Sequence, residues 1–228
     1  MAIKIAGTEV INDNKELVLA KLTEINSSID DTAVDVFIYD TSKDTDGGAW
    51  RHRTQHTSWY AEASSASRDE DTRSTRAEFP AVAVIVAESN KVTIYDGDDP
   101  SLPMWMVFNA DGVGSVMLAA NSSNPNTAVT AKNGIIVKSA TTYGVATVDF
   151  LKDAGDIYWN SSSRRFSSNS VAGRNEVGQS YVTLTDNKLV NNDANDVAMT
   201  VLPDAPTDPA TGLPVPTIAV ATDGCQCH

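Results

Sequence analysis

The sequence predicts a mainly β protein of antiparallel strands, in a propeller-like or sandwich-like domain with a short helix near the N-terminus. Three observations lead to this class. Short apolar or β-branched runs recur from residue 33 onward. Gly, Asn and Asp residues separate these runs as turn formers. Long amphipathic stretches do not alternate with the runs, as a parallel βαβ fold would require.

Ten runs have the composition and length of strands. They are residues 34–39, 79–87, 91–95, 104–108, 115–120, 134–139, 145–150, 181–185, 197–202 and 217–221. Turn-forming residues occupy 46–48, 96–100, 109–112, 132–134 and 186–188. Because antiparallel strands can be joined by such short turns, we expect neighbours in the sequence to pair in the sheets.

The spacing of similar pieces suggests a repeat. Residues 131–137 and 144–150 have the strand–turn–strand rhythm of a propeller blade, and residues 217–224 begin another such unit. At roughly 40 to 45 residues per blade the β region holds about four blades, whereas closed propellers use about four to eight. We therefore expect either a small ring or a chain that stops partway through one.

The chain divides into an N-terminal attachment or oligomerisation segment, residues 1–28, and a β-rich domain, residues 29–228. Within the domain we expect a loop at residues 61–78, where Arg residues mix with acidic ones and the backbone should be exposed. A second loop is expected at residues 203–216, because five prolines there exclude helix and central strand.

The N-terminal segment carries a narrow apolar seam. Val18, Leu22 and Ile25 follow a four–three spacing, and Ile11 lies one heptad before Val18. A helix of roughly 14 residues is marginal in isolation, so this helix should dock on its own domain or bundle with copies of itself. Val18, Leu22 and Ile25 are thus the predicted oligomer contact.

Composition limits the partners. With 17 basic and 30 acidic residues the net charge is −13, which argues against nucleic acid, because a phosphate backbone calls for clustered Lys and Arg. No apolar run of about 18 residues is present, so we expect no membrane insertion. The N-terminus lacks a secretory signal pattern, and we expect synthesis in a cytoplasm.

An aromatic and basic patch, defined as Trp50, Arg51, Arg53, Trp59 and Tyr60, is the densest cluster of such residues in the chain. We interpret it as structural, with the arginines stacking on the rings and the aromatic residues packing under the 61–78 loop. Two alternatives stay open. His52 and His56 could hold a metal, or Trp50, Trp59, Trp105 and Trp159 could be exposed platforms that stack on a glycan.

Candidate metal and catalytic motifs are weak. Cys225, Cys227 and His228 offer three soft ligands, but zinc usually takes four ligands from separated pairs. The codons of residues 225–228 can be chosen so that the neighbouring reading frame encodes a strand-forming sequence. We therefore expect that this C-terminus arose by a frame change or truncation in a longer ancestor. The acidic turns around Asp40 and Asp96 lack a calcium-loop pattern. Phosphate-loop, nucleophile-elbow and zinc-protease motifs are missing from the sequence. We predict no catalytic, cofactor or metal residue, and a protein that is not an enzyme.

Residues 3–17, IKIAGTEVINDNKEL, resemble the N-terminal segment of phage tail-fibre and virion proteins. The stretches 39–60, 78–86, 93–100 and 102–108 are similar to virion-associated proteins of marine and cyanobacterial tailed bacteriophages that carry a propeller-like β region. This resemblance covers most of the chain.

The resemblance implies a virion structural protein, of tail, fibre or collar type, made in the host bacterial cytoplasm. Such a protein would assemble with itself, as a trimer by preference or with sixfold or twelvefold symmetry, and would dock on other virion tail proteins. One alternative is a receptor- or glycan-binding β module of a tail fibre that contacts a host surface glycan. A propeller enzyme that degrades polysaccharide is the third reading.

Overall fold

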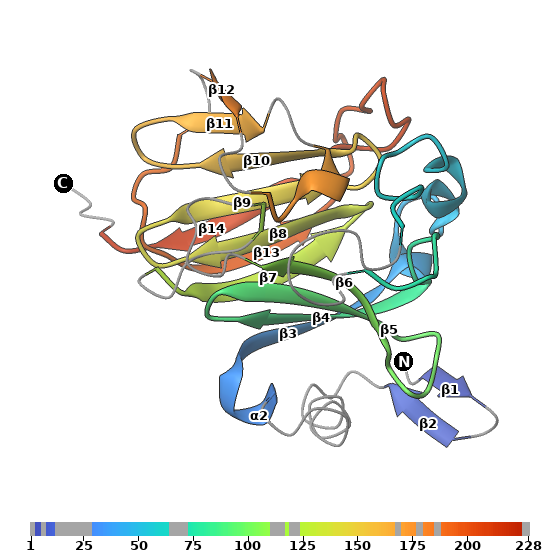
Figure 1. Cartoon of the computed structure of the whole chain (residues 1–228). Helices are drawn as coiled ribbons and strands as arrows, with labels where there is room; N and C mark the ends of the chain where they lie inside the picture. Colours follow the sequence, from blue (N-terminus) through green and yellow to red (C-terminus); the bar gives the residue numbers. More distant parts are fainter. Residues whose placement is uncertain are drawn as a thin grey trace.

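A computed structural model describes residues 3–5, 8–11, 29–63, 73–109, 117–118, 124–166, 170–176, 180–184 and 188–224. The predicted mainly β class is confirmed, because the described strands form four sheets and every pairing within them is antiparallel. Among the described residues the longest helix has only five residues. The described sheets are open and stacked, and they do not form a ring of propeller blades (Figure 1).

The largest sheet is a six-stranded meander with the order β12-β11-β10-β9-β8-β7. Its strands are β7 (Asn126–Lys132), β8 (Ile135–Ala140), β9 (Gly144–Asp149), β10 (Ala154–Tyr158), β11 (Ser163–Phe166) and β12 (Tyr181–Leu184). Asn133 and Gly134 join β7 to β8 with positive φ angles of 51° and 74°, as a two-residue hairpin turn requires. A side chain at Gly134 would also collide, since a Cβ there would lie 2.4 Å from Leu151 Cδ1.

A second sheet has four strands in the order β3-β4-β5-β6, and two hairpins complete the β structure. The four strands are β3 (Ala33–Asp40), β4 (Val82–Glu88), β5 (Lys91–Asp96) and β6 (Met104–Asn109). The hairpins are β13 (Ala194–Thr200) with β14 (Thr217–Thr222), and β1 (Ile3–Ile5) with β2 (Thr8–Ile11). The short helices are α2 (Ile29–Thr32), η1 (Thr41–Lys43), η2 (Ala49–Arg53) and η3 (Val171–Gly173).

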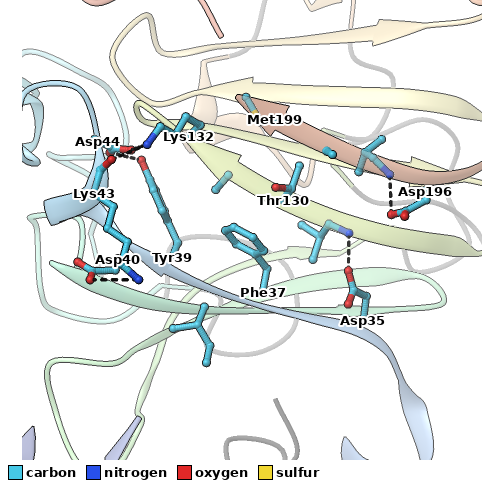
Figure 2. A pocket seen from close by; sticks show the side chains of 15 residues that line it. Asp35, Phe37, Tyr39, Asp40, Lys43, Asp44, Thr130, Lys132, Asp196 and Met199 are labelled. Atoms are coloured by element: carbon cyan, nitrogen blue, oxygen red, sulfur yellow. Dashed lines mark hydrogen bonds and ion pairs between the residues drawn. The ribbon is translucent and has the colours of Figure 1, made fainter. Parts of the chain in front are cut away.

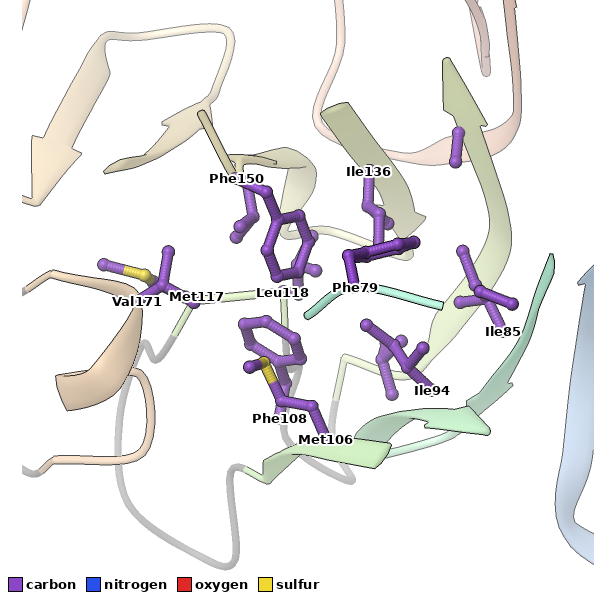
Figure 3. Close-up of a cluster of buried hydrophobic side chains, with 14 of the residues drawn as sticks. Phe79, Ile85, Ile94, Met106, Phe108, Met117, Leu118, Ile136, Phe150 and Val171 are labelled. Carbon is purple, nitrogen blue, oxygen red and sulfur yellow. The ribbon is translucent and has the colours of Figure 1, made fainter. Parts of the chain in front are cut away.

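The four-stranded sheet, the six-stranded sheet and the β13–β14 hairpin stack as three layers. Strand β4 shows why, because all seven of its residues are buried and successive side chains enter different clusters. The main core joins the four-stranded and six-stranded sheets, and Figure 3 shows Ile85 and Ile94 facing Ile136 and Phe150 across it. The other face of the six-stranded sheet packs on the hairpin through Val137.

Seven predicted strands lie where residues 34–39, 91–95, 104–108, 134–139, 145–150, 181–185 and 217–221 were expected, and those at 79–87 and 197–202 overlap β4 and β13. Five of the described strands were missed: β1, β2, β7, β10 and β11. Strands β7 and β10 contain Asn, Gly or Asp, which are depleted in strands, and β11 contains two arginines; pairing within the sheet overrides these preferences. The strand expected at 115–120 is wrong in its described part, since Met117 and Leu118 form a bend in the main core.

The predicted N-terminal helix, with Val18, Leu22 and Ile25, lies outside the described residues. Its proposed first seam residue, Ile11, belongs instead to β2, where it pairs with Ile3. A strand at this position cannot continue a heptad seam, so that extension of the helix is wrong. The separation of residues 1–28 from 29–228 stays a prediction.

The expected exposure of the 61–78 loop is wrong at Arg73, which is only 2% exposed and forms an isolated bridge with Met106 of β6. Arg73 therefore anchors the loop to the sheet, whereas Ala61, Ala63 and Thr75 are exposed as expected. The proline-rich loop at 203–216 also reaches inward, because Leu213 joins the main core and Thr207 bridges Pro214. Both long connections are held against the sheets at specific residues.

We expect Trp59→Ala to destabilise the protein by about 3 to 5 kcal/mol, because Trp59 is completely buried and its ring contacts Trp105 and Phe150. The half-buried Trp159 serves as the control, and Trp159→Ala should cost much less. Urea unfolding of both variants measures the difference. A loss below about 1 kcal/mol for Trp59→Ala would mean that the ring is not part of the core.

Candidate functional site

The tryptophans of the aromatic and basic patch lie inside the molecule. Trp50 and Trp59 are both 0% exposed. Each indole N–H has an acceptor: Trp50 Nε1 donates to Asp44 Oδ2 at 2.8 Å, and Trp59 Nε1 donates to the Phe150 carbonyl at 2.9 Å. Because a buried indole needs a partner for its N–H, these contacts fix both rings in place. Tyr60, half-buried, packs on Trp59 with ring centroids 6.0 Å apart.

The arginines of the patch tie separate segments together. Arg51 Nε donates to the Phe79 carbonyl at 2.9 Å and its Nη2 to Glu78 Oε1 at 3.2 Å. Arg53 reaches the proline-rich loop, where Nη1 donates to the Thr211 carbonyl at 2.7 Å. The stacking of Arg51 and Arg53 on aromatic rings was predicted, but the cation–π pairs among the described residues involve other arginines. Both guanidinium groups donate instead to oxygen acceptors.

Two further arginines, which the sequence reasoning did not select as a buried pair, share one carboxylate in the interior. Arg174 Nη1 donates to Glu62 Oε2 at 2.7 Å, and Arg73 Nε lies 3.9 Å from the same oxygen. Arg73 also lies 4.4 Å above the Trp105 ring, and Arg174 lies 5.6 Å from the Phe108 ring. Burial lowers the pKa of Arg73 to about 10, against the opposing attraction of Glu62. The pair fastens the ends of the 61–78 loop and the segment after β11 onto β6.

Asp44 is the centre of a buried hydrogen-bond network. Its carboxylate accepts from the Tyr39 hydroxyl, from Trp50 Nε1 and, at 2.8 Å, from the backbone N–H of Asn133. The Tyr39 hydroxyl in turn accepts from the Gly134 N–H at 2.7 Å. Burial raises the pKa of Asp44, an effect that these donors oppose. The network connects β3 and the following loop with the turn between β7 and β8.

This network closes one end of a groove of about 450 Å³ between β3, β7 and β13 (Figure 2). In Figure 2 the aromatic rings of Phe37 and Tyr39 stand below β7, while Lys132 and Met199 lie above. At the other end Asp35 draws the two sheets together, because its Oδ2 accepts from the Val129 N–H at 3.0 Å.

The polar groups of the groove already have partners. Asp35 Oδ1 accepts from the Val36 N–H, and Asp40 Oδ1 accepts from the N–H and hydroxyl of Ser42. Asp196 Oδ1 accepts from the Val197 N–H at 2.8 Å. Carboxylates used in this way stabilise strand edges and turns. The groove is therefore suited to surface contact more than to proton transfer.

The other candidate ligands do not converge. His52 and His56 are both exposed, and His52 Nδ1 lies 2.9 Å from Glu78 Oε1. Over the described part of the chain, no three His, Cys, Asp or Glu side chains come together as a metal site. Cys225, Cys227 and His228 lie outside the described residues. The acidic turn after β5 is instead held by Arg76, which pairs with Asp96 and Asp98.

The tryptophans proposed as glycan platforms are mostly unavailable. Trp50, Trp59 and Trp105 are completely buried, and only Trp159 reaches the surface in part. Trp159 packs edge-on against Tyr143, and the Arg164 guanidinium lies 4.9 Å from its ring centroid. Three of the four tryptophans are therefore unavailable for stacking on a glycan.

No family model, curated protein or solved structure matches this chain. Within the described residues, no helix is long and apolar enough to span a bilayer.

We expect Asp44→Ala to destabilise the protein by about 3 to 5 kcal/mol, because it leaves buried N–H groups of Trp50 and Asn133 without an acceptor. Asp40→Ala, in the same groove, is the matched control and should cost about 1 kcal/mol, since Asp40 caps only the exposed turn at Ser42. Thermal or urea unfolding separates the two. Equal losses would show that Asp44 is not the centre of the network.

Lys138 is a second buried charge site. It lies on β8 between Val129 and Ala146, which belong to the main core, and it is 1% exposed. Its ammonium makes no hydrogen bond or ion pair with any residue that the structure describes. Burial alone lowers the pKa of Lys138 from 10.5 to about 7.

The folded protein should therefore become more stable as the pH rises from 7 toward 10.5, because over that range the unfolded chain holds a proton on Lys138 that the folded chain has released. Below pH 7 Lys138 is protonated in both the folded and the unfolded state, so the free energy of folding includes the full cost of burying its charge. Lys138→Met should raise stability strongly near pH 6 and much less near pH 10. The exposed Lys188→Met is the control. A pH-independent gain at position 138 would contradict the buried, uncompensated amine.

Proposed function

We propose that this protein is a structural component of a bacteriophage virion, of tail, fibre or collar type. The proposal depends on one observation: the long connections between the strands are held against the sheets at fixed positions. The segments that carry the resemblance to virion proteins, among them Trp50, Trp59, Phe79 and Trp105, meet in one aromatic cluster with ring centroids 4.9 to 5.7 Å apart. A part that must keep its shape inside a larger particle requires such rigidity.

The architecture we propose is sandwich-like, with the β13–β14 hairpin as a third layer. It is supported by the two separate apolar clusters on opposite faces of the six-stranded sheet. A stack of antiparallel sheets also leaves free edges, at β12 and β14 in this molecule. Free edges are sites where neighbouring chains can add, and Tyr181 and Val182 on β12 are exposed.

In the proposed assembly the chain contacts itself and other virion tail proteins. Self-association would involve the N-terminal segment with Val18, Leu22 and Ile25, whose apolar seam is too short to be stable as an isolated helix. Threefold symmetry is the first choice, and sixfold or twelvefold symmetry around a tail axis is the alternative. The place of action is then the virion.

The virion role predicts that the protein is present in purified particles from the source, in a fixed ratio to other tail proteins, as measured by quantitative mass spectrometry. It also predicts that light scattering detects an oligomer of the full chain. The same chain without residues 1–28 should shift toward the monomer, and Lys188→Met should leave the oligomer unchanged. A monomeric full chain at high concentration, together with particles that lack the protein, would refute both the oligomer and the virion role.

A further inference from the structure

A second cavity, of about 200 Å³, lies beside the β13–β14 hairpin and shares Met199 with the groove of Figure 2. It opens between the outer face of β9, β10 and β11 and the start of β14. A smaller cavity of about 40 Å³ shares several of its lining residues and extends it toward the proline-rich loop. We call the larger cavity the hairpin cleft.

One wall of the hairpin cleft is polar and rigid. Asp156 on β10 and Arg165 on β11 form a two-pronged ion pair, with Nε–Oδ1 and Nη2–Oδ2 distances of 2.8 Å each. The Tyr158 hydroxyl lies 3.3 Å from Asp156 Oδ2, and desolvation raises the pKa of Tyr158 to about 12, so the phenol stays protonated. Arg165 is 53% exposed in its side chain and keeps Nη1 free of any partner among the described residues.

A second ion cluster borders the same wall. Asp149 Oδ1 accepts from the backbone N–H of Lys152 at 3.0 Å, and the Lys152 ammonium lies 3.7 Å from Asp149 Oδ2. Lys152 also pairs with Asp208 of the proline-rich loop. The hairpin cleft is thus lined by two carboxylates, Asp149 and Asp156, and two cations, Lys152 and Arg165, whereas Asp208 lines only the smaller cavity.

The facing wall is apolar. It consists of Val215 and Pro216 from the proline-rich loop, Met199 from β13 and Ile218 from β14. These side chains come from elements that are held in position by the hydrogen bond from Arg53 to the Thr211 carbonyl and by the β13–β14 pairing. A ligand in the cleft therefore meets hydrocarbon on one side and a row of hydrogen-bonding groups on the other.

This combination discriminates between classes of ligand. A phosphate or a carboxylate would meet two carboxylates beside two cations that are already paired with them, so it would gain no net attraction. A purely apolar ligand would bury Asp156, Arg165 and Tyr158 without partners from water, which costs more than the apolar contact returns. A neutral ring with hydroxyl groups on its rim and C–H groups on its face satisfies both walls. Its volume must also be small, given about 200 Å³.

We propose that the hairpin cleft binds one residue of a neutral carbohydrate, with its hydroxyl groups on Asp156, Arg165 and Tyr158 and its C–H face on Val215 and Ile218. This site uses none of the tryptophans that the sequence suggested as stacking platforms. It stands independently of the virion role, since it depends only on the walls of the cleft. The experiments can therefore distinguish a virion protein that lacks this site from a carbohydrate-binding protein that is not part of a virion.

The test uses the full chain and saturation-transfer NMR with four probes: glucose, galactose, mannose and N-acetylglucosamine, each at up to about 20 mM, the range in which single sugar residues bind. We expect a signal from at least one probe. Asp156→Asn should weaken binding at least about tenfold, because it removes a charged hydrogen-bond acceptor. Asp40→Asn, in the groove of Figure 2, is the matched control and should bind normally.

A second variant guards against misfolding as the cause of a loss. Val215 is 42% exposed, so Val215→Trp is tolerated sterically at the surface but places a large ring at the mouth of the cleft. This variant should unfold at the same temperature as the original chain and should lose the signal. No signal from any probe, or equal signals from the original chain, Asp156→Asn and Val215→Trp, would overturn the site. Particle mass spectrometry remains the separate test of the virion role.

Discussion

The structure depends on one buried carboxylate more than on any other single group. Asp44 sits in a loop with no regular structure beyond short 3-10 turns, yet it accepts hydrogen bonds from β3, from the loop itself and from the turn between β7 and β8. The two sheets can therefore meet at only one relative position along this edge. Trp50 is oriented by the same carboxylate, and the aromatic cluster around Phe79 builds on that ring. Burial raises the pKa of Asp44 and outweighs the three donors, which favour its ionised form.

The excess of acidic residues has a structural use that composition alone does not reveal. Several carboxylates terminate strand edges and turns: Asp35 accepts from a β7 N–H, and Asp98 accepts from the N–H groups of Ala81 and Val82. The interior holds charges of both signs, because Arg73, Arg174 and Lys138 are buried and so are Asp44 and Glu88. A chain with a net charge of −13 thus also buries cations, and it uses many of its carboxylates as acceptors for backbone N–H groups. The acidic residues thus have a structural role in addition to their contribution to the surface charge.

The sequence was sufficient for the fold class because apolar and β-branched runs identify strands wherever the interior side chains are themselves apolar. Strands β4 and β5 are of this kind. It was insufficient for β10 and β11, whose outward faces carry Asp156 and Arg165 as an ion pair that stabilises the sheet through pairing across strands. The burial of Arg73 could not be anticipated, since two of its acceptors are the carbonyl groups of Trp59 and Trp105, which only folding brings to it. The same limit applies to the hairpin cleft, which joins β8, β10, β11 and β14.

The long sequence separations between contacting residues also determine the order in which these contacts can form during translation. Trp59 cannot form its hydrogen bond until Phe150, 91 residues later, has been translated. Asp44 likewise cannot accept from the Asn133 N–H, 89 residues later, before Asn133 is made. Arg53 is not satisfied until Thr211, 158 residues further on, has been translated. The four-stranded sheet thus leaves the exit tunnel with one apolar face uncovered for the time needed to synthesise the next strands, at about 5 to 20 residues per second. Loop closure of this kind makes folding slow. Until those strands are made, the uncovered apolar face is a surface through which nascent chains can aggregate.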